Sequence, residues 1–217
     1  MTKQRVAVLI SGRGSNMAAL IEAAKDERFP AEIVLVMSNR PAAAGLAAAR
    51  AAGLATAIVD HAAYGKDRDA FERALQAALD AHAVDLVCLA GFLRLLTPRF
   101  VGHWRGRMIN IHPALLPAFK GLDTHARALA AGVKIHGASV HFVVPDMDSG
   151  PIIAQGAVAV RDDDTAETLA ARVLAIEHRI YPAALALLAA GRIEIVGGRC
   201  LIAGAPATDG QLLVPEI

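Results

Sequence analysis

The hydrophobic positions in the first half of the chain form short runs that alternate with alanine-rich stretches. Each run has the length of a strand. The runs cover residues 5–10, 32–37, 55–59, 84–90 and 108–111, and the stretches with helical spacing cover 15–25, 42–52 and 67–82. This alternation predicts βαβ units, and hence a mostly parallel sheet with helices on both faces.

The hydrophobic pattern changes after Asn110. Residues 137–144 and 151–160 alternate more clearly between apolar and polar side chains and are separated by a short turn, so we expect a mixed sheet in the second half. Near the C-terminus, residues 192–196 and 199–204 flank Gly197 and Gly198, a pair that favours a two-residue hairpin turn.

A long helix is predicted between the mixed sheet and this hairpin. Asp164 and Glu167 have the spacing of an N-cap and its capping-box partner. Pro182 is expected to kink or restart the helix, because proline cannot donate the backbone hydrogen bond. The positions expected to face the core are Leu169, Val173, Ile176 and Ile180.

The composition excludes several classes of protein. The chain of 217 residues is 55% hydrophobic but only 4% aromatic, which suits one core of small aliphatic side chains. A net charge of +1 without a block of Lys or Arg argues against a nucleic-acid partner. Cys88 and Cys200 form neither a metal-binding pair nor a disulfide framework, and no run approaches a membrane span. We therefore expect a soluble cytoplasmic protein with no membrane contact and no metal.

A glycine-rich loop, within VAVLISGRGSNM, follows the first predicted strand. Gly12 and Gly14 fit G-x-G-x-x-G, but Met17 stands at the third glycine position, and the second strand ends without an acidic residue for a ribose. Free backbone N–H groups at a helix N-terminus bind anions, so the loop suits a phosphate monoester better than a dinucleotide. A tight turn with Ser15 or Asn16 as helix cap remains an alternative.

The stretch MINIHPALLPAFKG contains the candidate chemistry. Asn110 and His112 point to the same side of a strand that Pro113 terminates, because side chains alternate along a strand. An amide donor beside a titratable imidazole, at the carboxyl end of a parallel strand, lies where open α/β folds bind ligands. Taken alone, the pair also fits a structural Asn and His in a loop.

The longer string NIHPALLPAFKGLDTHARAL resembles the folate-dependent formyltransferase family, together with HGASVHFV, AGFLRLLTP, EHRIYP and VVPDMDSGPIIAQ. The resemblance spans nearly the whole chain. It implies a single Rossmann-like formyltransferase domain over residues 1–217, with a nucleotide-binding half in 1–110 and the folate loop and C-terminal half in 111–217. It also implies transfer of a formyl group from 10-formyltetrahydrofolate to the amine of glycinamide ribonucleotide in purine biosynthesis. The partners would be these small molecules, and the protein a monomer or homodimer.

The resemblance assigns roles to individual residues. Asn110 would donate a hydrogen bond to the oxyanion, His112 would carry the proton, and Asp148 would favour the charged imidazolium. The residues implied on the ribonucleotide side are Gly14, Ser15, Asn16, Leu174 and Glu177. The residues implied on the folate side are Arg68, Leu93, Arg94, Leu95, Leu96, Asn110, Val144, Pro145, Asp146, Met147 and Asp148.

Two other functions remain open from the sequence. One is a formyltetrahydrofolate deformylase, in which water replaces the amine on the same scaffold. The phosphate loop and Glu177 argue against it, since a hydrolase has no need of them. The other is a non-catalytic nucleotide-binding or regulatory domain, against which the joint presence of Asn110, His112 and Asp148 argues.

Overall fold

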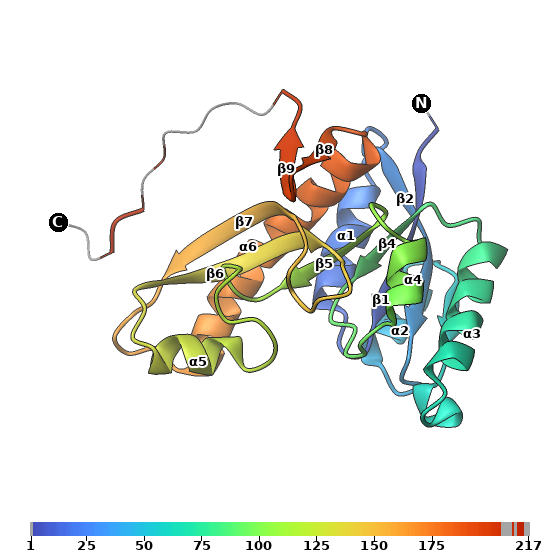
Figure 1. The fold of residues 1–217 in the computed structure, drawn as a ribbon, viewed down its shortest axis with the longest axis horizontal. Helices are drawn as coiled ribbons and strands as arrows, with labels where there is room; N and C mark the ends of the chain where they lie inside the picture. The colour runs from blue at the N-terminus through green and yellow to red at the C-terminus, as the bar shows by residue number, and fades with distance from the viewer. Residues whose placement is uncertain (1, 205–209, 211, 215–217) are drawn as a thin grey trace.

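A seven-stranded sheet forms the centre of the structure, a computed structural model that describes residues 2–204, 210 and 212–214 (Figure 1). Its strands are β1 (Gln4–Ile10), β2 (Ala31–Ser38), β3 (Thr56–Ile58), β4 (Leu86–Leu89), β5 (Met108–His112), β6 (Ile135–Phe142) and β7 (Ile152–Ala159). They lie in the order β3-β2-β1-β4-β5-β6-β7. The first five are parallel, and β6 and β7 are antiparallel to their neighbours, which confirms the predicted change to a mixed sheet.

Helices cover both faces of this sheet (Figure 1). They are α1 (Ser15–Ala24), α2 (Ala44–Ala51), α3 (Arg68–Ala81), α4 (Pro98–His103), α5 (Thr124–Ala130) and α6 (Ala166–Ala189), with the short 3-10 helix η1 (His61–Tyr64). The alternation along β1 builds two cores. Val6 and Val8 pack in the cluster that includes α1, α2 and α6, whereas Ala7 and Leu9 pack with α3 and α4. The elements α4, α5 and η1 were not predicted, because each is too short for a helical period to stand out.

The start of α6 corrects the predicted capping box. Thr165 is the N-cap, and its side chain and that of Thr168 each accept a hydrogen bond from the other's backbone N–H. Glu167 is therefore not the partner. Asp164 is instead held by Arg172, whose Nη1 donates to Oδ1 at 2.8 Å, and this pairing holds the pKa of the Asp164 carboxyl well below its usual range. Arg172, two turns into the helix, binds the Asp164 carboxylate that the local pattern predicted as the N-cap.

The remainder of α6 is one continuous helix. It runs through Pro182 as one helix, so of the two predicted effects of the proline, a kink or a restart, the restart does not occur. Tyr181, Ala184 and Leu185 are fully buried on either side of the proline, and this packing favours a continuous helix. Leu169 and Val173 are buried as predicted.

The C-terminal hairpin forms as predicted from β8 (Ile193–Val196) and β9 (Arg199–Ile202). Gly197 and Gly198 join them with φ of 55° and 79°, the left-handed conformation that this type of turn requires. Within the described part of the chain, no helix has the length and apolarity needed to span a bilayer.

The order of the strands identifies where a ligand would bind. The chain passes from β1 to β2 on one side of the sheet, and then returns to β4 and β5 on the other side of β1. The loops after β1 and β4 therefore leave the sheet in opposite directions. In open α/β sheets the crevice at the carboxyl ends of such strands is the usual ligand site.

Candidate active site

The register between β5 and β6 builds the first part of the site. Asn110 lies opposite His141, and His112 lies opposite Ser139. The amide Nδ2 of Asn110 is 3.2 Å from Nε2 of His141, and the other ring nitrogen of His141 is 2.9 Å from the Phe142 carbonyl oxygen. Nδ1 of His141 thus faces a backbone carbonyl, while Nε2 faces the Asn110 amide. His141 therefore contacts the amide of Asn110 across the two strands.

Asp148 reaches this group from the loop after β6. Its Oδ2 lies 3.4 Å from Nδ1 of His112, and its Oδ1 lies 3.7 Å from Nε2 of His141. The backbone N–H of Gly121 donates to Oδ2 at 2.9 Å. Burial by itself raises the pKa of the Asp148 carboxyl, but the nearby His141 ring, the hydrogen bond from Gly121 N–H and the charge of His112 outweigh it and hold the pKa below its ordinary value. Asp148 is therefore an anion beside a buried imidazole.

The second nitrogen of His112 faces another oxygen. Nε2 lies 3.0 Å from the carbonyl oxygen of Phe119, and the ring is buried. Both ring nitrogens of His112 thus face oxygen acceptors, so each N–H of an imidazolium formed by proton uptake would have a partner.

The segment that follows His112 is held by β6 and β7. The Ser139 hydroxyl donates to the Ala114 carbonyl at 2.7 Å and accepts from Leu116 N–H at 3.0 Å, while Gln155 donates to the Leu116 carbonyl. Closure of the loop that carries Asp148 depends on Gly150, where a Cβ atom would lie 1.8 Å from the Phe142 carbonyl oxygen. The antiparallel strands therefore position both segments around His112.

Two further histidines back the Phe119 segment. The rings of His125 and His136 are 5.3 Å apart, and the Phe119 ring is 5.7 Å from His136. Burial, with a smaller contribution from the charge of His125, lowers the pKa of His136 to about 4, and burial also lowers the pKa of His125. At neutral pH both rings are uncharged, so they add no positive charge next to His112.

The loop after β1 is built on close backbone contacts. Gly14 is the N-cap of α1 with φ of 76°, and a Cβ atom there would lie 3.2 Å from the Cα of Gly45. Gly45, at the start of α2, donates its N–H to the Gly12 carbonyl at 3.0 Å. The sequence did not single out Gly45, because nothing near it in the chain indicates a contact with the glycine-rich loop. Gly12 has open space where its Cβ would lie, so packing within the protein does not require that glycine.

The first turn of α1 contacts α6. Asn16 Nδ2 donates to Glu177 Oε2 at 2.6 Å, and both side chains are buried. Burial raises the pKa of the Glu177 carboxyl, and the hydrogen bond from Asn16 offsets part of this effect. Ser15 and Leu174 are half-buried nearby along the same two helices. Of the residues predicted on the ribonucleotide side, Asn16 and Glu177 are therefore in direct contact.

The predicted folate segment, residues 93–96, follows β4. The side chains of Leu93 and Leu95 are 60% and 63% exposed. Arg68 does not extend freely into solvent: its Nη2 donates to the Leu95 carbonyl oxygen at 2.6 Å. The Arg94 guanidinium lies over the Phe71 ring, 5.5 Å from its centroid. Leu96 and Val144 are half-buried, whereas Pro145, Asp146 and Met147 are exposed.

The glycine-rich loop follows β1, residues 93–96 follow β4, and Asn110 and His112 lie in β5. These three strands are adjacent in the sheet.

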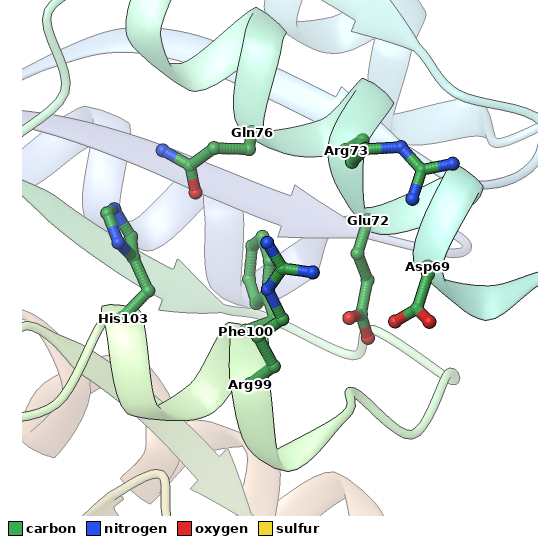
Figure 2. A pocket seen from close by; sticks show the side chains of 7 residues that line it. All are labelled: Asp69, Glu72, Arg73, Gln76, Arg99, Phe100 and His103. Atoms are coloured by element: carbon green, nitrogen blue, oxygen red, sulfur yellow. The ribbon is translucent and has the colours of Figure 1, made fainter.

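A separate hollow of about 150 Å³ lies between α3 and α4, as Figure 2 shows. Its lining in the described part of the chain is Asp69, Glu72, Arg73, Gln76, Arg99, Phe100 and His103, and it includes no predicted site residue.

Comparison with known proteins gives the family. The formyl transferase model matches residues 4–185. The chain is 43% identical to phosphoribosylglycinamide formyltransferase of Escherichia coli over 97% of this chain and 96% of that protein. It is 50% identical to the trifunctional purine biosynthetic protein adenosine-3 of Bos taurus over 89% of this chain, but spans only 19% of that longer protein. The crystal structure of glycinamide ribonucleotide transformylase 1 from Symbiobacterium toebii superposes with a TM-score of 0.89 at 47% identity, covering 92% of this chain and 94% of that one. The chain therefore belongs to the formyl transferase family.

Proposed function

We propose that this protein transfers a formyl group from 10-formyltetrahydrofolate to the amine of glycinamide ribonucleotide, giving formylglycinamide ribonucleotide and tetrahydrofolate. The observation that carries the proposal is the contact of His112 with the carboxylate of Asp148, beside Asn110 at the carboxyl end of β5. The names of the relatives that match nearly full length support this choice of substrate. Both cysteines are free thiols, which suits the reducing cytoplasm.

The reaction needs a proton carrier and a donor to the oxyanion. The substrate amine attacks the formyl carbon and forms a tetrahedral oxyanion, which then expels the folate nitrogen. Asn110 donates an N–H to the oxyanion, a contribution of about 3 kcal/mol in comparable sites. His112 moves a proton from the attacking amine to the departing nitrogen, and Asp148 stabilises the imidazolium formed in between.

His112 must exchange one of its present partners to do this. Nδ1 faces Asp148, so Nε2 is the nitrogen available to the substrates, and in this structure it contacts the Phe119 carbonyl. Proton transfer through Nε2 therefore requires the Phe119 carbonyl to give way to the substrate amine. Substrate binding and movement of the segment around Phe119 are then coupled.

The remaining residues divide between the two substrates. The backbone N–H groups at the start of α1, with Ser15 and Asn16, bind the 5-phosphate, because a helix N-terminus attracts anions. Glu177 and Leu174 contact the ribose and glycinamide portion. The backbone of residues 93–96 and the loop 144–148 hold the pterin, and Arg68 lies toward the glutamate tail.

One assay tests this proposal. Purified protein is mixed with 10-formyl-5,8-dideazafolate, and release of the deformylated folate is followed with and without glycinamide ribonucleotide. We expect release only when the ribonucleotide is present, in a 1:1 ratio with formylated product. Release without the ribonucleotide would identify a deformylase, and no release in either case would contradict an enzymatic function with these substrates.

A further inference from the structure

Residues 90–97 have no regular secondary structure, although they lie at the point where ligands bind in this type of sheet. Two backbone hydrogen bonds attach its first residues to β1 and Ser11, from Ala90 N–H to the Leu9 carbonyl and from Ser11 N–H to the Gly91 carbonyl. Among the described residues, no backbone–backbone hydrogen bond holds 92–96. The conformation of this part therefore depends on other contacts from the rest of the chain. Phe92 and Leu96 pack against the core on the α3 and α4 side, but Leu93 and Leu95 expose their side chains, so packing does not fix these two residues.

Helix α3 holds the middle and the end of the segment. Arg68 donates to the Leu95 carbonyl at 2.6 Å, and Glu72 accepts from the backbone N–H of Thr97 at 2.5 Å and from its hydroxyl. Thr97 is the N-cap of α4. Figure 2 shows Glu72 pointing from α3 toward α4. Arg68 is exposed, whereas Glu72 is buried.

The beginning of the segment is held by a serine at the end of β1. The Ser11 hydroxyl oxygen accepts the N–H of Leu93 at 2.8 Å and donates to Asn39 Oδ1 at 2.6 Å. Ser11 is 4% exposed and Asn39 is fully buried, so the bond between them is shielded from bulk water, and the bond to the Leu93 N–H is partly buried. Asn39 is itself anchored, because its backbone carbonyl lies 2.7 Å from Nδ1 of His61 in η1. A buried chain of contacts thus fixes Leu93 from the neighbouring strands.

We propose that Ser11 is a positioning residue for the folate, acting through the backbone of Leu93. This inference rests on the proposed function, in which residues 93–96 present backbone groups to the pterin. The Ser11 hydroxyl sets the position of the first of these groups. Removing it leaves the Leu93 N–H and Asn39 Oδ1 without their partner and frees the backbone of Leu93.

The effect is specific for one of the two substrates. The loop that follows Ser11 is held by separate contacts, the hydrogen bond from Gly45 N–H to the Gly12 carbonyl and the packing of Gly14 against Gly45. The backbone of Ser11 also remains attached to the sheet through its own N–H, which donates to the Gly91 carbonyl at 3.0 Å. The ribonucleotide site therefore does not depend on the Ser11 hydroxyl.

Ser38 provides a matched control. It is fully buried, ends the neighbouring strand β2, and pairs with Ile10, next to Ser11. Its hydroxyl also makes two hydrogen bonds, donating to the Arg40 carbonyl and accepting from the Arg40 N–H. Neither bond reaches residues 90–97. Ser38→Ala thus removes a buried serine hydroxyl from the same sheet edge without releasing Leu93.

The experiment measures KM for 10-formyl-5,8-dideazafolate, KM for glycinamide ribonucleotide, and kcat in the wild type, Ser11→Ala, Ser11→Thr and Ser38→Ala. In Ser11→Ala we expect the folate KM to rise about tenfold, the effect of one lost hydrogen bond, with ribonucleotide KM and kcat within about twofold of the wild type. Ser11→Thr keeps the hydroxyl and should restore most of the folate affinity. Ser38→Ala should leave both KM values unchanged. Ser11→Cys is the second variant if Ser11→Ala does not fold. Its side chain is of similar size but forms only weak hydrogen bonds, so the folate KM should rise above that of the wild type.

Three outcomes would overturn the inference. They are an unchanged folate KM in folded Ser11→Ala or Ser11→Cys, an equal rise for both substrates, and an equal folate effect in Ser38→Ala. Failure of the proposed function gives a different result, because the wild-type protein itself would then show no turnover of the folate with the ribonucleotide.

Discussion

Asn16 and Glu177 are 161 positions apart in the chain and share a hydrogen bond of 2.6 Å between Nδ2 and Oε2. The bond joins the first turn of α1 to the middle of α6, immediately beside the loop after β1. Because Glu177 is buried and Asn16 is its hydrogen-bond donor, the two side chains form one unit on the ribonucleotide side of the proposed site.

Asn16→Ala is expected to raise KM for glycinamide ribonucleotide by about 10- to 100-fold with little change in kcat, because a bond to a charged group is lost equally in ground and transition states. Ser15→Ala should act in the same direction with a smaller effect. Steady-state kinetics on both variants measure this, with Glu22→Ala, an exposed change on the same helix, as the control. A fall in kcat at unchanged KM would remove both residues from the phosphate site.

Asp148→Asn is expected to keep the fold and the affinity for both substrates, and to lower kcat by about 10²- to 10⁴-fold, because the carboxylate stabilises the imidazolium only while the proton is in transit. Single-turnover rates and calorimetric binding of each substrate measure the two effects separately. Asp123→Asn removes a charge from an exposed left-handed position in the same region and should be nearly silent. Near-normal turnover in Asp148→Asn would mean that His112 acts without it.

Arg68→Ala is expected to weaken folate binding by about tenfold, since it removes the hydrogen bond to the Leu95 carbonyl as well as a positive charge near the glutamate tail. The loss should be larger for a polyglutamylated folate than for the monoglutamate. Arg73→Ala, which removes an exposed arginine from the same helix, is the matched control. If the wild type and Arg68→Ala each bind the polyglutamylated folate and the monoglutamate with equal affinity, Arg68 lies outside the tail site and acts only on the Leu95 carbonyl.

The free energy of unfolding should fall as the pH is lowered, because burial depresses the pKa of His136 in the folded protein. Its folded-state pKa of about 4 lies below the value of about 6.5 for an unfolded histidine, so the unfolded chain binds the proton first. Above pH 6.5 the ring is neutral in both states and the free energy of unfolding is at its full value. Between about pH 6.5 and pH 4 it falls by at most about 3 kcal/mol. Urea unfolding across this range measures it. His136→Asn should flatten the slope, and the exposed control His103→Asn should retain it; a parallel slope in His136→Asn would contradict the assignment.

Local patterns were sufficient for most of the secondary structure. The apolar runs, the switch to an alternating pattern after Asn110, and the Gly197-Gly198 turn each depend on residues close together in the chain, so the sequence predicted the mixed sheet and the terminal hairpin. Where distant residues compete, the local pattern was wrong. The N-cap of α6 is Thr165 because Arg172 binds Asp164, and α6 does not restart at Pro182, because residues on either side of it are buried.

The sequence by itself determined which chemical groups the protein carries and which strand ends present them. Asn110 and His112 share a side of β5 because side chains alternate, and the glycine-rich loop must follow β1 because the apolar run ends there. The resemblance to formyltransferases also named Asp148 and Glu177. Only the tertiary structure decided which groups touch: Asp148 against His112, His141 against Asn110, Asn16 against Glu177, and Ser11 against Leu93. These contacts depend on strand register and on how helices pack across the sheet, and long-range geometry of this kind leaves no periodic signal in the chain.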